Sequence, residues 1–182
     1  AMRIAKDLGL TSRMQIVAPN LTQSIVEQAG PGLMEGVVGT EPWTWRVPEL
    51  ENSQAGKAFV KTYSERYAMY PSSSAASAYS IVQQWADAAK RANSLDSEAL
   101  IKALEGHSYT LLKDRQQWRS FDHQNLQTVY AVKVKPRAEV LKDPLKQDYF
   151  EIVERLDGST ALPDLATWQA ERRNAGQPLA LQ

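Results

Sequence analysis

The chain has 182 residues, with 21 Lys and Arg against 21 Asp and Glu, 43% hydrophobic residues and no cysteine. The balanced charge gives no indication of a basic surface for nucleic acid or anionic lipid, and no apolar run approaches the ~18 residues that cross a bilayer. The absence of cysteine excludes disulfides, thiol catalysis and Cys-ligated zinc, although it does not fix the compartment.

The first forty residues have a strand, helix and strand pattern. A short apolar run at 15–18 predicts a buried strand, residues 22–30 predict a short helix, and residues 36–40 predict a second strand. The loop that follows carries two indoles, Trp43 and Trp45. This order over so few residues favours parallel pairing, so we expect a mostly parallel sheet with flanking helices.

Three helices are predicted next, over 52–68, 73–92 and 96–106. The second of these has an apolar stripe with many small residues, which allows another element to approach closely. The stripe consists of Ala75, Ala78, Tyr79, Val82, Trp85, Ala86 and Ala89.

Beyond Gly106 the apolar residues alternate, which predicts a hairpin over 108–121 and strands at 127–135 and 148–156. The intervening segment 136–147 is rich in Pro and Lys and is expected to be an exposed excursion. A last, charged helix is predicted over 165–173.

Seven short segments in a fixed order carry a resemblance to a known family. They are 5–10 (AKDLGL), 16–19 (IVAP), 35–40 (EGVVGT), 59–63 (FVKTY) with Tyr67 and Tyr70-Pro71, 78–79 (AY), 99–106 (ALIKALEG) and 122–124 (DHQ). From about Ile4 to Leu156 the chain resembles the branched-chain amino-acid type of periplasmic substrate-binding protein, which serves ABC importers. The resemblance implies an α/β fold, namely the C-terminal half of a two-lobed type I periplasmic-binding-protein fold that encloses a solute between its lobes.

The resemblance also implies a division of the chain. Residues 1–42 are expected to form a second-lobe segment, residues 43–124 a first-lobe segment with three helices and a hairpin, and residues 125–182 the return to the second lobe with the C-terminal strands and tail. We then expect a truncated form, without the half that supplies most of the first lobe's sheet. Its first-lobe helices are left with apolar faces, so a homo-oligomer formed through them is expected.

The candidate ligand-binding residues are Asn20, Leu21, Trp43 and Trp45. Asn20 follows a predicted parallel strand, at the sheet edge where open α/β folds place ligands. In amino-acid-binding relatives this position commonly holds a carboxylate that pairs with the ligand ammonium, and the neutral amide leaves room for an amide, a carboxylate or an aromatic acid. The alternatives are that Asn20 caps the next helix, and that at least one indole packs structurally rather than stacking on a ligand.

Asp122 and His123 are the only support for an enzyme, because a carboxylate can orient an imidazole for general-base work. Adjacent strand residues point to opposite faces, and no nucleophile, zinc or phosphate-loop motif accompanies the pair. A turn with a solvated histidine is the favoured interpretation. The two histidines give no metal site, and no catalytic residue or cofactor is predicted.

The leading functional hypothesis is the solute-binding component of an ABC importer, located in the periplasm. Its expected ligand is a small molecule, such as a hydrophobic or branched-chain amino acid, an amide or an aromatic acid, and its expected partner is the importer's membrane permease. The alternative is a self-associating structural or interaction module that binds no solute.

Overall fold

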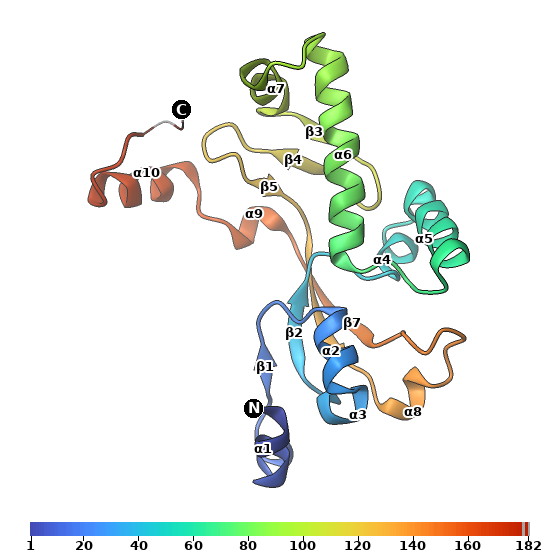
Figure 1. Ribbon diagram of the computed structural model, residues 1–182. Helices are drawn as coiled ribbons and strands as arrows, with labels where there is room; N and C mark the ends of the chain where they lie inside the picture. The colour runs from blue at the N-terminus through green and yellow to red at the C-terminus, as the bar shows by residue number, and fades with distance from the viewer. Residues whose placement is uncertain (180, 182) are drawn as a thin grey trace.

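The computed structural model describes residues 1–179 and 181, apart from the side chain of Ala161. It arranges them as two units (Figure 1). Three segments, around residues 42, 128 and 157, pass from one unit to the other, and we call them the passing segments. The elements are α1 (Met2–Asp7), a 3-10 turn (Leu10–Ser12), β1 (Val17–Ala18), α2 (Gln23–Ala29), α3 (Pro31–Met34), β2 (Val38–Glu41), α4 (Val47–Leu50), α5 (Gln54–Tyr67), α6 (Ser73–Ala92), α7 (Ser97–Leu104), β3 (Ser108–Tyr109), β4 (Gln116–Trp118), β5 (Asn125–Leu126), β6 (Val129–Val134), α8 (Arg137–Val140), β7 (Phe150–Leu156), α9 (Gly158–Ala161) and α10 (Leu165–Asn174).

The first unit, which we call the four-stranded unit, holds a sheet of order β1-β2-β6-β7. Only β1 and β2 are parallel, with Val17 opposite Val38, whereas β2–β6 and β6–β7 are antiparallel. The expectation of a mostly parallel sheet is therefore wrong for this sheet. The reason is the path of the chain: it leaves β2 toward the second unit and re-enters β6 from that side, so β6 must run against β2.

The core of this unit lies between the sheet and helices α2, α3 and α8, which Figure 1 shows beside the strands. Buried side chains alternate along β6 at Tyr130, Val132 and Val134, as expected for a strand with one covered face. The predicted exposed excursion at 136–147 is only partly exposed. It contains α8, whose Val140 is buried in the same core, because an apolar side chain there completes the cover of the sheet.

The second unit, which we call the three-stranded unit, holds an antiparallel sheet of order β3-β4-β5, and helices α6 and α7 pack on each other beside it (Figure 1). Helix α6 spans the predicted residues and begins at Ser72, whose side chain accepts a hydrogen bond from the amide of Ala75. Its buried positions are Ala76, Gln84 and Ala88.

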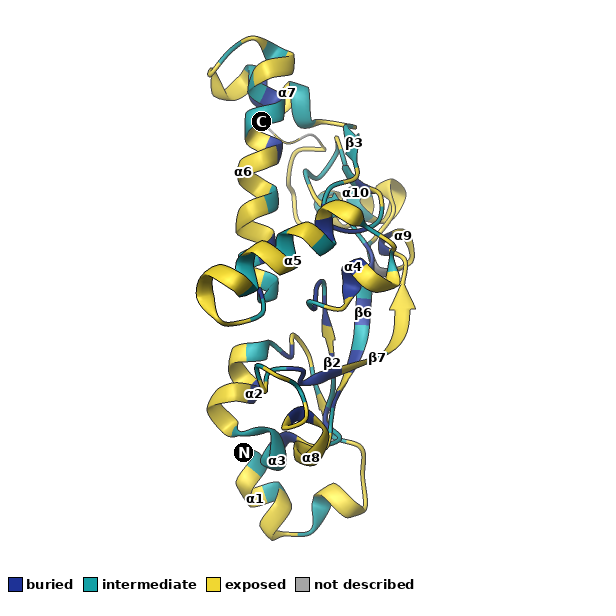
Figure 2. Cartoon of the chain, turned by 90° about the vertical axis from the view of Figure 1, so that its right-hand side faces the viewer, coloured by how far each residue is buried: buried dark blue, intermediate teal, exposed yellow. Residues whose placement is uncertain are grey.

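The predicted apolar stripe of α6 is largely on the outside (Figure 2). Val82 is 60% exposed and Trp85 is 51% exposed, and Tyr79 is also exposed. The buried residues of the helix, Ala76, Gln84 and Ala88, lie on another side, so the larger apolar side chains of the stripe are left exposed. Whether a second copy covers this face stays a prediction.

The C-terminal helices lie beside the three-stranded unit. Arg119 donates to the carbonyl oxygen of Pro163 at 2.7 Å, and the rings of Phe121 and Trp168 meet edge to face with centroids 5.5 Å apart. The predicted lobe boundaries at 42 and 124 stay a prediction, and the end of the predicted tail, at 180 and 182, lies outside the described residues.

Candidate functional site

The ends of the two parallel strands, β1 and β2, meet where the two units join. Ala18 lies opposite Gly39 in the sheet, and three residues further on the amide of Leu21 donates to the carbonyl oxygen of Thr40 at 3.2 Å. The amide of Asn20 would make this bond if the register of β1 continued, so the chain has one extra residue here, and Asn20 lies in the bend between β1 and Leu21 near the end of β2. Parallel strand ends are where open α/β sheets bind ligands, so we take this edge as the candidate site.

The structure places the first two predicted ligand residues in different environments. Asn20 is exposed, with a positive φ of 55°, a left-handed conformation that asparagine tolerates. Leu21 is fully buried and belongs to the core of the four-stranded unit. The cap of α2 is Thr22, whose hydroxyl accepts from Ile25, so the alternative in which Asn20 caps this helix is wrong.

The two indoles are both packed against other side chains. Trp43 is 4% exposed, donates to the carbonyl oxygen of Pro71 at 3.1 Å and meets the ring of Phe59 edge to face. Trp45 is stacked on Tyr70, with ring centroids 4.0 Å apart, and carries the guanidinium of Arg46 on its ring. Both indoles line a small cavity at the junction, so their predicted contact with a ligand remains a prediction.

Glu41 is the residue of this edge that sequence reasoning missed. Its side chain is 1% exposed, and neither carboxylate oxygen has a hydrogen-bond partner among the described residues. Burial raises the pKa of Glu41 to about 7, and the nearby Ser73 side chain opposes that rise only in part. The one signal in the sequence is a charged residue directly after an apolar strand (GVVGTE), which is unusual for the end of a buried strand.

A second buried carboxylate, Asp148, lines the same cavity and is fully paired. Arg46 donates two hydrogen bonds to it, at 2.8 and 2.6 Å, and Lys135 donates a third at 2.5 Å. Burial alone would raise the pKa of Asp148, but these two cations outweigh burial and hold the pKa below its usual range. Asp148 is therefore a structural anion, whereas Glu41 is without a counterion.

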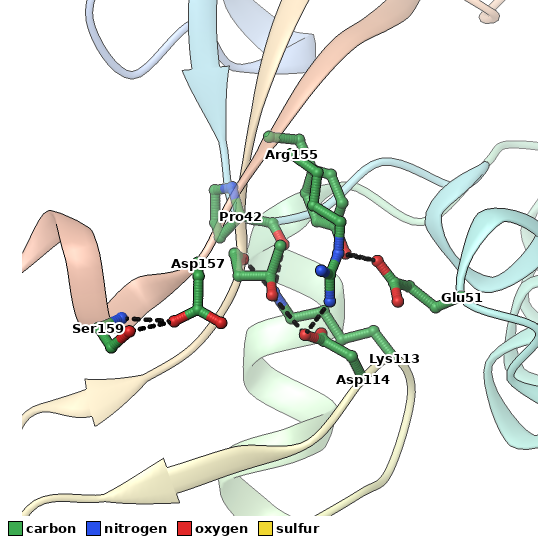
Figure 3. A network of polar contacts seen from close by, with 9 residues as sticks. Pro42, Glu51, Lys113, Asp114, Arg155, Asp157 and Ser159 are labelled. Carbon is green, nitrogen blue, oxygen red and sulfur yellow. Dashed lines mark hydrogen bonds and ion pairs between the residues drawn. The ribbon is translucent and has the colours of Figure 1, made fainter.

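The three segments that pass between the units are tied together by a polar network (Figure 3). The buried ammonium of Lys113 donates to the carbonyl oxygens of Pro42, at 2.8 Å, and Thr128, at 2.6 Å. Burial lowers the pKa of Lys113 to about 8. Two different passing segments are thus held by one side chain from the loop between β3 and β4.

The third passing segment joins the network through Arg155. Its guanidinium donates to Glu51 at 2.8 Å and to Asp114 at 3.1 Å. Glu51 also accepts from the hydroxyl of Tyr130 at 2.9 Å, and burial together with this bond raises the pKa of Tyr130. The network thus joins all three passing segments to one another at the junction of the two units.

A larger cavity of about 210 Å³ lies on the other side of Trp43, between α6 and the three-stranded sheet. Buried atoms without a hydrogen-bond partner in the described part of the chain face this region, namely Trp118 Nε1 and Asn125 Oδ1. Its lining is mixed, with the apolar Ile81 and Leu112 beside the polar Gln116.

The Asp122 and His123 pair has no catalytic geometry. Asp122 is paired with the guanidinium of Arg119, and the Nε2 atom of His123 lies 2.9 Å from a carboxylate oxygen of Glu105 instead. His123 has a positive φ of 56°, which places it in a turn as favoured from the sequence. Among the residues that the structure describes, no three His, Cys, Asp or Glu side chains are grouped to hold a metal ion.

Comparisons with known proteins point to one family. A family model described as periplasmic binding protein matches residues 1–139. A periplasmic binding protein from Burkholderia mallei is 26% identical, with a TM-score of 0.76 over 92% of this chain and 42% of that protein. A search of curated proteins finds no match.

Two further solved structures share the fold at lower identity. A branched-chain amino acid ABC transporter periplasmic ligand-binding protein from Burkholderia xenovorans LB400 is 21% identical, with a TM-score of 0.75 over 91% of this chain and 42% of that protein. An ABC transporter solute-binding protein from Rhodopseudomonas palustris BisB5, solved with 3,4-dihydroxybenzoic acid, is 19% identical, with a TM-score of 0.66 over 86% of this chain and 41% of that protein. The chain thus spans well under half the length of these proteins, and no helix in its described part has the length and apolarity to cross a membrane.

Proposed function

The chain belongs to the periplasmic binding protein family, and from this premise we propose that it is part of the solute-binding component of an ABC importer. The family and its α/β fold were both predicted from the sequence, and the comparisons confirm both. The family consists of solute-binding proteins that are not enzymes, so we assign no catalytic role to the chain.

The arrangement of the passing segments at the junction of the two units is the observation that supports this proposal. Three segments pass between the units, and Lys113 and Arg155 tie them together with hydrogen bonds. The candidate binding edge at Asn20 and Glu41 lies beside these segments. A solute held at this edge touches both units, so its binding energy favours the arrangement in which they close on it.

The proposed solute is a hydrophobic or branched-chain amino acid, an amide or an aromatic acid. The solved relatives named above include one described for branched-chain amino acids and one that holds 3,4-dihydroxybenzoic acid. The indoles of Trp43 and Trp45 offer planar apolar surface near the edge. We propose a periplasmic location and the importer's membrane permease as partner on the same grounds.

A thermal-shift screen of the natural polypeptide that carries this chain tests the proposal, with L-leucine, L-phenylalanine, their amides and 3,4-dihydroxybenzoate as probes. A solute at a hundredfold excess over its dissociation constant stabilises the folded state by about 2.7 kcal/mol, which is readily measured. Stabilisation by at least one probe is expected. No stabilisation by any of them would contradict the proposal.

The second candidate function is a self-associating module that binds no solute. It is favoured by the exposed apolar face of α6, where Val82 and Trp85 are each more than half exposed and Tyr79 is also exposed. A contiguous apolar face of this kind is typical of an interaction surface. Sedimentation of the chain at micromolar concentration tests this candidate, and a monomer would contradict it.

A further inference from the structure

Glu41 is a buried carboxylate without a partner, and a comparison with Asp148 shows how unusual this is. Both side chains line the same junction cavity and both are less than a tenth exposed. Asp148 is bound by Arg46 and Lys135, whereas neither oxygen of Glu41 accepts a hydrogen bond from any residue that the structure describes. A buried anion of this kind is costly unless a cation or several donors reach it.

Among the described residues, no cation is paired with the carboxylate of Glu41. The two cations bound at the neighbouring carboxylate, Arg46 and Lys135, are both paired with Asp148. On the opposite wall, the hydroxyl of Ser72 caps α6, and the side chain of Ser73 is a neutral donor near the carboxylate that only partly opposes the rise in its pKa. The cavity has a volume of about 10 Å³, which is room for one group of the size of a water molecule or an ammonium.

The other walls of this cavity add no positive charge at Glu41. Trp43 and Trp45 line it, and the ring of Trp45 is already covered by Tyr70 and the guanidinium of Arg46. At the neighbouring strand end stands Asn20, which is neutral, so the negative charge of this sheet edge comes from Glu41. The position of Glu41, its lack of a counterion and the small cavity beside it favour the binding of a small positively charged group.

We propose that Glu41 is a specificity-determining residue of the solute site, and that its carboxylate binds the ammonium group of a primary amine such as an amino acid. This inference rests on the proposed solute-binding function. The amine donates to one or both carboxylate oxygens of Glu41, and the rest of the solute extends from the sheet edge. Among the solutes considered above, Glu41 selects amino acids and their amides over aromatic acids that lack an amine.

The test uses the natural polypeptide that carries this chain, with pairs of probes that differ only in the amine. L-Leucine is compared with 4-methylpentanoate, and L-phenylalanine with 3-phenylpropanoate, by isothermal titration calorimetry. The wild type is expected to bind the amine of at least one pair about 30-fold more tightly than its deaminated partner. Glu41→Gln should abolish that preference, while Glu35→Gln, which removes an exposed carboxylate, should keep it.

A second measurement needs no variant. The other titratable side chains of the cavity are Asp148, whose pKa lies below its usual range, and Tyr149, whose pKa burial raises to about 12. Of the lining residues, Glu41 alone therefore changes charge between about pH 6 and pH 8. The affinity for the amine probe should rise with pH through this range, because Glu41 becomes ionised. Where Glu41 is still protonated in the free protein, binding of this probe should release a proton. The deaminated probe should show neither effect.

The outcomes separate the two proposals. A wild type that prefers the deaminated probes, or 3,4-dihydroxybenzoate, overturns the role of Glu41 and leaves the proposed function standing. An unchanged preference in Glu41→Gln, or amine binding that does not respond to pH, also overturns the role of Glu41. Failure of every probe to bind the wild type overturns the proposed function itself.

Discussion

The Nζ atom of Lys113 lies 2.8 Å from the carbonyl oxygen of Pro42, so a buried ammonium joins the β3–β4 loop to the segment that leaves β2. The same atom binds the carbonyl oxygen of Thr128, which precedes β6. One side chain therefore satisfies two backbone acceptors on two passing segments. This is a structural role that a flexible surface lysine does not have.

Lys113→Met should destabilise the chain, because it leaves both carbonyl oxygens buried without a donor. We expect a loss of about 2 kcal/mol in the free energy of unfolding, measured by urea denaturation. Lys61→Met, at an exposed position on α5, is the control and should change stability by less than about 0.5 kcal/mol. Equal effects of the two substitutions would contradict the role of Lys113.

Gly158→Ala should also destabilise the chain, because the second and third passing segments touch there. A Cβ atom at Gly158 would lie 2.4 Å from the backbone oxygen of Gln127 and 2.7 Å from its nitrogen. Neither backbone atom can move freely, so we expect a loss of about 2–3 kcal/mol. Gly32→Ala is the matched control: its nearest neighbour is the flexible side chain of Arg137 at 3.3 Å, and no loss of stability should follow.

Trp43 and Trp45 should respond differently to replacement by phenylalanine. Trp43→Phe removes the buried hydrogen bond to the carbonyl oxygen of Pro71 and should cost about 1–2 kcal/mol. Trp45→Phe keeps an aromatic ring stacked on Tyr70 and should cost less than about 1 kcal/mol. The two free energies of unfolding, from urea denaturation, check this order, and a larger loss for Trp45→Phe would contradict it.

The stability of the chain should carry a pH dependence that belongs to Glu41. Its folded-state pKa, about 7, lies above the ordinary value of 4.5, so the folded state binds more protons between these two values. The contribution of Glu41 is therefore fully present below about pH 4.5 and is lost as the pH rises through 7, by about 3 kcal/mol in total. Glu41→Gln should be the more stable protein above pH 7, with a difference that shrinks in acid.

The control for this measurement is Glu35→Gln, because Glu35 is exposed. Its difference from the wild type should stay flat over the same pH range. A flat difference for Glu41→Gln as well would show that the carboxylate is not buried in solution.

Val82→Glu should reduce any self-association through the outer face of α6. Val82 is 60% exposed among other apolar side chains, and a charge there opposes burial of that face against a second copy. Sedimentation velocity at micromolar concentration should show a lower apparent mass than for the wild type. Val153→Glu, on the exposed side of β7, should leave the mass unchanged, and a similar drop in both variants would contradict a specific role for α6.

Local patterns in the sequence predicted the helices and the family more fully than they predicted the site. Helix α6 has the predicted bounds, because its cap at Ser72 and its apolar period are encoded within the helix itself. Strand direction was missed, since the antiparallel pairing of β2 with β6 depends on the path of the chain through the second unit. The short elements α3, α8 and β5 were also missed, because packing rather than propensity forms them.

The burial of the charged residues at the junction also could not be predicted from local sequence patterns. Glu41 and Lys113 are ordinary charged residues in the sequence, and their burial arises only when distant segments meet. Asn20, in contrast, was placed correctly at the end of β1, because a strand that stops at a proline is a local feature. A role of Asn20 in ligand contact stays a prediction.

The pairing of Glu41 with Tyr130 also constrains how the protein is made. The ribosome releases β2 long before β6, so the four-stranded sheet cannot be completed until most of the described chain has been translated. The intervening residues, with their local helices and tight hairpins, are able to form structure first. Until β6 is available, the edge of β2 that pairs with it has unmatched backbone groups, which is a site where a strand of another chain can add.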